Sequence, residues 1–209
     1  MHLPTLVSAV VTSCLICTAG PGVGATRNAP SASGESPEQI VRLLAEDGKL
    51  IALPTGKGTI KHRINKDTPS FVFPTGPSRV VVFKMPEYRA PYTLIIRSNL
   101  GFGFSKSVFV PRGFFFDAEF RQTLVLPETQ FTTRERGMTK GYHLEANIQV
   151  NDQNKEDRFL LLYTNDEAVG ERQGTATATS ASATFVAMID LPVRRASEGI
   201  VEFETKPNK

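Results

Sequence analysis

Short segments of β-branched and aromatic residues recur between prolines and glycines over most of this 209-residue chain. In Tyr142–Val150 apolar and polar residues alternate, so one face of the segment should be buried and the other wet. Val80–Phe83 and Phe159–Leu162 are apolar throughout, which is typical of central strands covered on both faces. The pattern predicts an all-β fold, an antiparallel two-layer β-sandwich with Greek-key or jelly-roll-like connections. The predicted strands are Thr59–Ile64, Ser70–Phe73, Arg79–Lys84, Tyr92–Ser98, Ser107–Val110, Phe114–Phe120, Thr123–Leu126, Tyr142–Val150, Arg158–Thr164, Thr184–Asp190 and Gly199–Glu204.

One short helix is expected before the strands. Ser36–Gln39 has a capping residue, a proline suited to the first helical position, and a glutamine three residues after the cap. This predicts an N-terminal helix over 37–47 within a single sandwich domain covering 36–209. Gly170–Ala183 lacks large apolar residues, so we expect a long mobile surface loop with a ragged edge strand near 175–179.

The N-terminus has the features of an export signal. Residues 1–25 contain no Lys, Arg, Asp or Glu, and Leu3–Cys17 is mostly apolar. That run is shorter than the ~20 residues of a bilayer span and suits a signal-peptide core. We predict a signal peptide over 1–25, cleaved after Ala25, and a flexible tether over 26–35.

A second processing route stays open. Val11-Thr12-Ser13-Cys14 fits a lipoprotein box, in which Cys14 would receive diacylglycerol. The apolar residues that follow Cys14 favour the soluble form, since lipoproteins usually begin with small or polar residues. Both forms place the domain outside the cytoplasm, in the periplasm or anchored in the cell envelope.

Composition excludes several classes of function. A net charge of +3 is too small to indicate a nucleic-acid surface. The two cysteines, Cys14 and Cys17, leave the rest of the chain without a thiol, which excludes a disulfide framework and a four-cysteine zinc site. His62 and His143 are expected to be solvated surface residues. No catalytic motif is found, so we predict no enzyme activity, no cofactor and no metal.

Three polar clusters have structural explanations. Asp117 and Glu119 are expected on the polar side of one strand. The acidic residues of 151–157 are expected in a hairpin loop, and Gly56–Thr59 in a turn.

Tyrosine rings offer the one candidate ligand surface. Tyr88, in a polar turn, and Tyr92 could stack against a sugar ring, as aromatic side chains of sugar-binding modules do. The alternative is that they pack against neighbours at a sheet edge.

The order of segments resembles a known family. Six segments carry the likeness: Phe71–Ser78, Val80–Pro86, Tyr92–Ser98, Val108–Pro111, Phe114–Phe120 and Arg158–Thr164. Together they are similar to the maltose operon periplasmic protein family, MalM, over roughly residues 36–204.

The resemblance implies an exported, non-enzymatic accessory or binding protein associated with maltose or maltodextrin uptake, with a maltodextrin or another envelope protein as its partner. The family offers no catalytic residues to transfer. An alternative function of another class is an envelope structural or protein-interaction module, lipid-anchored or soluble, with no sugar ligand and no membrane contact beyond the anchor.

The two processing routes would give mature proteins of different mass. We expect the exported protein to begin at Thr26, because cleavage after Ala25 fits the small residues before it. Intact-mass spectrometry of the purified exported chain measures this directly. A chain that begins at a diacylated Cys14 would show that the lipoprotein route operates.

Overall fold

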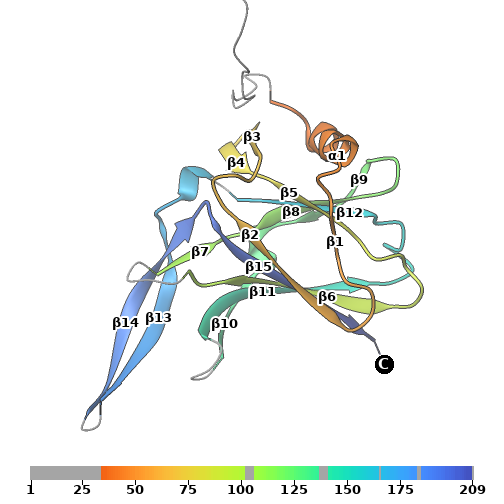
Figure 1. Cartoon of the computed structure of the whole chain (residues 1–209). Helices are drawn as coiled ribbons and strands as arrows, with labels where there is room; N and C mark the ends of the chain where they lie inside the picture. The colour runs from red at the N-terminus through yellow and green to blue at the C-terminus, as the bar shows by residue number, and fades with distance from the viewer. Residues whose placement is uncertain (1–33, 102–105, 137–140, 165, 183–184, 209) are drawn as a thin grey trace, which may run out of the picture.

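Two five-stranded β-sheets pack face to face and form most of the molecule (Figure 1). The computed structural model describes residues 34–101, 106–136, 141–164, 166–182 and 185–208. The two packed sheets confirm the predicted β-sandwich. The first sheet, here called the helix-covered sheet, has the order β1 (Ile51–Ala52), β5 (Val81–Lys84), β12 (Phe159–Tyr163), β8 (Arg112–Phe116), β9 (Gln122–Leu126). The second, here called the polar-faced sheet, has the order β10 (Thr132–Arg136), β11 (Gly141–Val150), β6 (Tyr92–Asn99), β15 (Gly199–Pro207), β2 (Gly58–Ile64).

The strands of both sheets pair antiparallel, except that β1 and β5 are parallel. A hairpin and a separate three-stranded sheet complete the β-structure. These are β3 (Ser70–Phe73) with β4 (Gly76–Arg79), and β13 (Arg172–Ser182) with β14 (Phe185–Ala196) and β7 (Ser107–Phe109). Two short 3-10 helices are η1 (Glu128–Gln130) and η2 (Asp166–Ala168).

Alternate residues of each sheet fill the core between them. Phe83 of the helix-covered sheet and Phe203 of the polar-faced sheet are both fully buried, with ring centroids 4.2 Å apart. The alternation predicted for Tyr142–Val150 is confirmed, because its apolar residues all lie in this core. Burial of this kind contributes about 25 cal/mol per Å² of apolar surface and is the main force that joins the sheets.

The helix covers the outer face of the first sheet. α1 (Pro37–Glu46) begins with the predicted cap: Ser36 Oγ accepts from the Gln39 amide, and the Gln39 side chain accepts from the Ser36 amide at 2.9 Å. Ile40, Val41 and Leu44 are buried against this face. β5 and β12 are thus covered on both sides, as their apolar sequences predict.

Most of the segment predicted as a mobile loop over Gly170–Ala183 is instead strand β13, which includes the edge strand expected near 175–179 and has a register shift between Arg172 and Gly174. β13 pairs with β14 along its length, and Figure 1 shows this two-stranded ribbon extending away from the two sheets. The prediction was wrong because it weighed side-chain size, whereas β14 satisfies the backbone of β13 whatever side chains β13 carries. The strand predicted over Phe114–Phe120 was also too long at its C-terminal end, because β8 ends at Phe116. β10 was not predicted, because its charged residues suggested a loop.

A close backbone contact in β8 can be tested. A Cβ on Gly113 would lie 2.6 Å from the Leu161 carbonyl oxygen and 2.8 Å from Leu162 Cδ2 of β12. We expect Gly113→Ala to lower the free energy of unfolding by about 1–3 kcal/mol, measured by urea denaturation. Gly34→Ala is the matched control, because its Cβ would meet only the Val72 carbonyl oxygen at 3.8 Å. Equal stability of the two variants would contradict the close packing of β8 on β12.

Candidate functional site

A pocket of about 460 Å³ lies where β6 begins and β15 ends. Its lining residues are Thr55, Gly56, Pro86, Glu87, Arg89–Pro91, Tyr92, Thr205 and Pro207. Pro86, Pro91 and Pro207 supply apolar and rigid walls. Glu87 and Arg89 supply a charged rim, with side chains 77% and 86% exposed. The pocket therefore combines an apolar wall with polar groups that solvent can reach.

One buried hydroxyl holds the loop that forms a side of this pocket. Thr205 is 3% exposed, and its Oγ1 contacts the carbonyl oxygens of Pro54, at 3.3 Å, and of Gly56. Gly56 has φ of +71°, a left-handed conformation that suits glycine. The turn predicted over Gly56–Thr59 is found only in part, as a bend over 55–57, because β2 already begins at Gly58. The end of β15 thus fixes the position of the loop before β2.

The two candidate tyrosines lie in different surroundings. Tyr92 lines the pocket, and burial, followed by the charge of Asp157, raises its pKa to about 12, so the phenol is neutral at physiological pH. Tyr88 does not line the pocket. It packs partly against the core, and its hydroxyl donates to Asp152 Oδ1 at 3.4 Å. The structure therefore places Tyr92, and not Tyr88, in the pocket wall.

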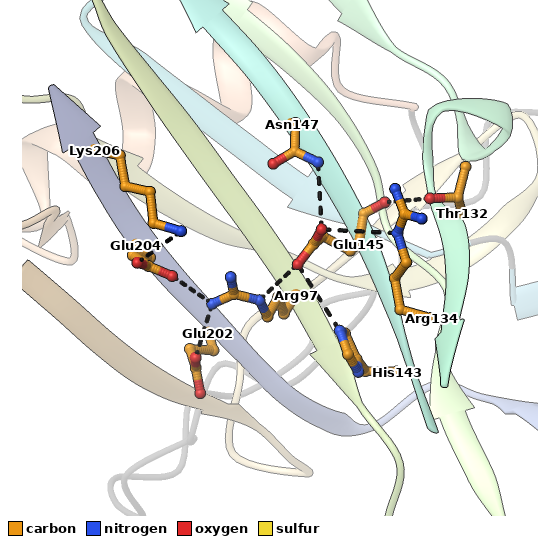
Figure 2. Close-up of polar contacts among 9 residues, drawn as sticks. All are labelled: Arg97, Thr132, Arg134, His143, Glu145, Asn147, Glu202, Glu204 and Lys206. Carbon is orange, nitrogen blue, oxygen red and sulfur yellow. Dashed lines mark hydrogen bonds and ion pairs between the residues drawn. The ribbon is translucent and has the colours of Figure 1, made fainter. Parts of the chain in front are cut away.

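A second polar site lies on the outer face of the polar-faced sheet. Arg97 of β6 is only 8% exposed and lies between carboxylates of both neighbouring strands, as Figure 2 shows. Its Nε donates to Glu145 of β11 at 2.8 Å. Its Nη1 donates to Glu202 at 3.2 Å and to Glu204 at 2.7 Å, both on β15. One guanidinium thus joins three adjacent strands.

Burial and charge oppose each other in this cluster. Burial alone would lower the pKa of Arg97, but the hydrogen bonds and charges of Glu145 and Glu204 raise it overall. Burial alone would raise the pKa of each of these two carboxyls, but Arg97 lowers both. Arg97, Glu145 and Glu204 are therefore held in their charged forms.

Outer cations complete the neutralisation. Lys61 Nζ lies 3.3 Å from Glu202, Lys206 Nζ lies 3.2 Å from Glu204, and Arg134 Nε lies 3.9 Å from Glu145. Each carboxylate already has a second basic partner. We conclude that this cluster fixes the alignment of β11, β6 and β15 and has no unpaired charge with which to bind a ligand. An arginine within the apolar strand Tyr92–Ser98 was the sequence signal for it.

Both histidines differ from their expected solvated positions. His143 is 3% exposed, and its Nε2 lies 3.8 Å from Glu145 Oε2. It faces outward, as the alternation predicts, but its neighbours on the sheet cover it. His62 is half-buried with its ring edge-on to Phe83, and burial lowers its pKa. Sequence alternation assigns a face of the sheet, but coverage of that face depends on neighbouring strands.

The acidic clusters are turn structures. Asp117 follows β8 rather than lying within a strand, and it accepts hydrogen bonds from the Glu119 and Arg121 amides and from Arg121 Nε. Asp157, 4% exposed, ends the predicted hairpin loop and accepts from the Thr123 hydroxyl at 2.5 Å. Burial raises the pKa of Asp157, an effect that the Thr123 hydrogen bond only partly offsets.

Other site predictions concern residues that the structure does not describe. The signal peptide, the cleavage at Ala25 and the lipidation of Cys14 fall within 1–33, as does most of the tether. In the part of the chain that is described, no three His, Cys, Asp or Glu residues are grouped as metal ligands. No helix among the described residues has the length and hydrophobicity to cross a membrane.

The Arg97 cluster gives a stability prediction. Arg97→Met leaves three part-buried carboxylates without their shared partner, and we expect a loss of about 3 kcal/mol in the free energy of unfolding at neutral pH. Lys61→Met is the matched control. It removes a cation whose side chain is 66% exposed, and should cost at most about 1 kcal/mol. Urea denaturation measures both, and a similar small loss in each would contradict a structural role for Arg97.

Asp157 gives a pH prediction. Because its pKa is raised in the folded state, its ionisation opposes folding, and stability is lost as pH rises through the folded pKa. We expect Asp157→Asn to gain stability relative to the wild type as pH rises from below 3.8 to neutral. Denaturation at a series of pH values tests this. A stability difference that does not change with pH would contradict it.

Comparison with known proteins identifies the family. A family model described as maltose operon periplasmic protein precursor (MalM) matches residues 75–198. A comparison with curated proteins finds no match. The matched region runs from the turn between β3 and β4 to the residue before β15 and includes Tyr92, Arg97 and Glu145. This chain therefore belongs to the MalM family of maltose operon periplasmic proteins.

Proposed function

We propose that this protein is a non-enzymatic accessory protein of carbohydrate uptake that binds a short maltodextrin in the pocket beside Tyr92. The family supports the link to a maltose operon and to the periplasm. The soluble periplasmic form is our proposal for the mature protein, with a lipid-anchored form through Cys14 as the alternative.

The pocket carries the binding part of the proposal. Its volume of about 460 Å³ falls in the usual range of small-molecule sites, roughly 300–1,000 Å³. A sugar presents apolar C–H faces and a rim of hydroxyls, so it needs an aromatic or apolar wall with polar groups beside it. Tyr92 and the three prolines supply the wall, while Glu87, Arg89 and Thr55 supply hydroxyl partners.

The same pocket favours binding over hydrolysis. Glycosidases of the common type place two carboxyl groups on either side of the bond that they cleave. Glu87 is the only carboxylate among the residues that line this pocket. A bound maltodextrin would therefore meet one acid and no second group in the required position.

A second candidate function is a protein-interaction module without a sugar ligand. The β13–β14 ribbon, which extends away from the two sheets, favours it (Figure 1). The two candidates differ in whether the pocket binds sugar.

Titration calorimetry with maltose and longer maltodextrins tests the first candidate. We expect Glu87→Ala and Arg89→Ala to weaken binding about tenfold each without loss of stability, because both side chains are largely exposed. Glu119→Ala is the matched control, since its side chain is 65% exposed and does not line the pocket. Tyr88→Ala should weaken binding less than the rim variants do, because Tyr88 is outside the pocket. No binding of any maltodextrin to the wild type would exclude this candidate and leave the second.

A further inference from the structure

The β13–β14 ribbon has fewer strands than an independently stable sheet needs. β7 pairs with β14 only at Arg194, Arg195 and Ala196. From Val193 outward, β14 pairs with β13 alone. A two-stranded hairpin is marginally stable in water, and three or more strands are normally required. The described part of the ribbon therefore has an incomplete sheet along most of its length.

The outer edge of β13 lacks the features that keep edge strands from pairing. Natural edge strands carry charges, prolines or bulges that block further pairing. β13 has a charge and a register shift only at its start, at Arg172–Gly174, and from Thr175 to Ser182 it contains no charged residue and no proline. The edge strands of the polar-faced sheet do carry charges: Lys61 and Arg63 on β2, and Arg134 on β10.

The opposite edge of the ribbon is better protected. β14 contains Asp190 and Pro192, and β7 covers its final residues. Asp190 and Pro192 thus interrupt the free edge of β14, whereas the edge of β13 is uninterrupted from Thr175 to Ser182. Pairing through the same edge in both copies gives a closed pair of molecules rather than an open-ended fibre.

We propose that β13 pairs antiparallel with β13 of a second copy of this chain, giving a four-stranded sheet in the order β14-β13-β13-β14. The sequence of β13 suits self-pairing, because Thr175–Thr179 alternates threonine and alanine. A two-fold axis at Ala178 places Thr177 of one copy opposite Thr179 of the other, and Ala178 opposite Ala178. Cross-strand threonine pairs stabilise antiparallel sheets, and two-fold dimers are the commonest protein assemblies.

The proposed dimer does not cover the pocket beside Tyr92. The pocket lies at the start of β6 and the end of β15, near the C-terminus, whereas β13 extends from the other side of the molecule (Figure 1). The proposal is thus independent of the proposed sugar binding, and either can fail without the other.

Sedimentation velocity of the exported protein over a range of concentrations tests the dimer. We expect a reversible monomer–dimer equilibrium. Thr177→Lys should raise the dissociation constant of the dimer on the order of tenfold or more, because it brings charges of both copies together at the new strand pair. Thr59→Lys is the matched control, since it adds the same charge to the exposed edge strand β2 and should leave the equilibrium unchanged.

Hydrogen exchange keeps the test decisive if Thr177→Lys disturbs the ribbon itself. In the wild type, amides of 174–182 should exchange more slowly as protein concentration rises, while those of β2 should not change. A protein that stays monomeric at every soluble concentration would overturn the proposal. So would a dimer that Thr177→Lys leaves intact, together with exchange in β13 that does not depend on concentration.

Discussion

The apolar layer between the two sheets is the constraint on which the rest of the structure depends. Alternate residues of the central strands point into it, and contacts such as that between Phe83 and Phe203 join the sheets directly. Because side chains alternate along a strand, a one-residue shift in register would turn every buried residue outward. The positions of the loops, and therefore of the pocket, follow from this register.

The outer face of the polar-faced sheet adds a second constraint on register. Arg97 can reach Glu145 on one side and Glu202 and Glu204 on the other only if β11, β6 and β15 are aligned as they are. Part-buried charges without partners cost several kcal/mol, so misaligned strands would be penalised. Apolar burial thus favours assembly of the sheets, while this cluster disfavours wrong alignments.

The candidate pocket is a product of the same framework. Two loops from different parts of the chain meet the ends of β6 and β15, and Thr205 ties one loop to the sheet. A rigid scaffold with a site formed by its end loops is a common arrangement for binding proteins. The ribbon of β13 and β14 emerges elsewhere, so ligand binding and assembly can use separate surfaces of the molecule.

The sequence by itself determined the two-layer β-fold, the capped helix, the central position of β5 and β12, and the family. These features depend on local signals: period-two alternation, a capping box, uniformly apolar runs and ordered motifs. Tertiary structure alone decided that His143 is buried, that Arg97 meets three glutamates, that Tyr92 and not Tyr88 lines the pocket, and that β13 is a strand. Each of these depends on which strands become neighbours. Residues distant in sequence settle that pairing, and no local pattern records it.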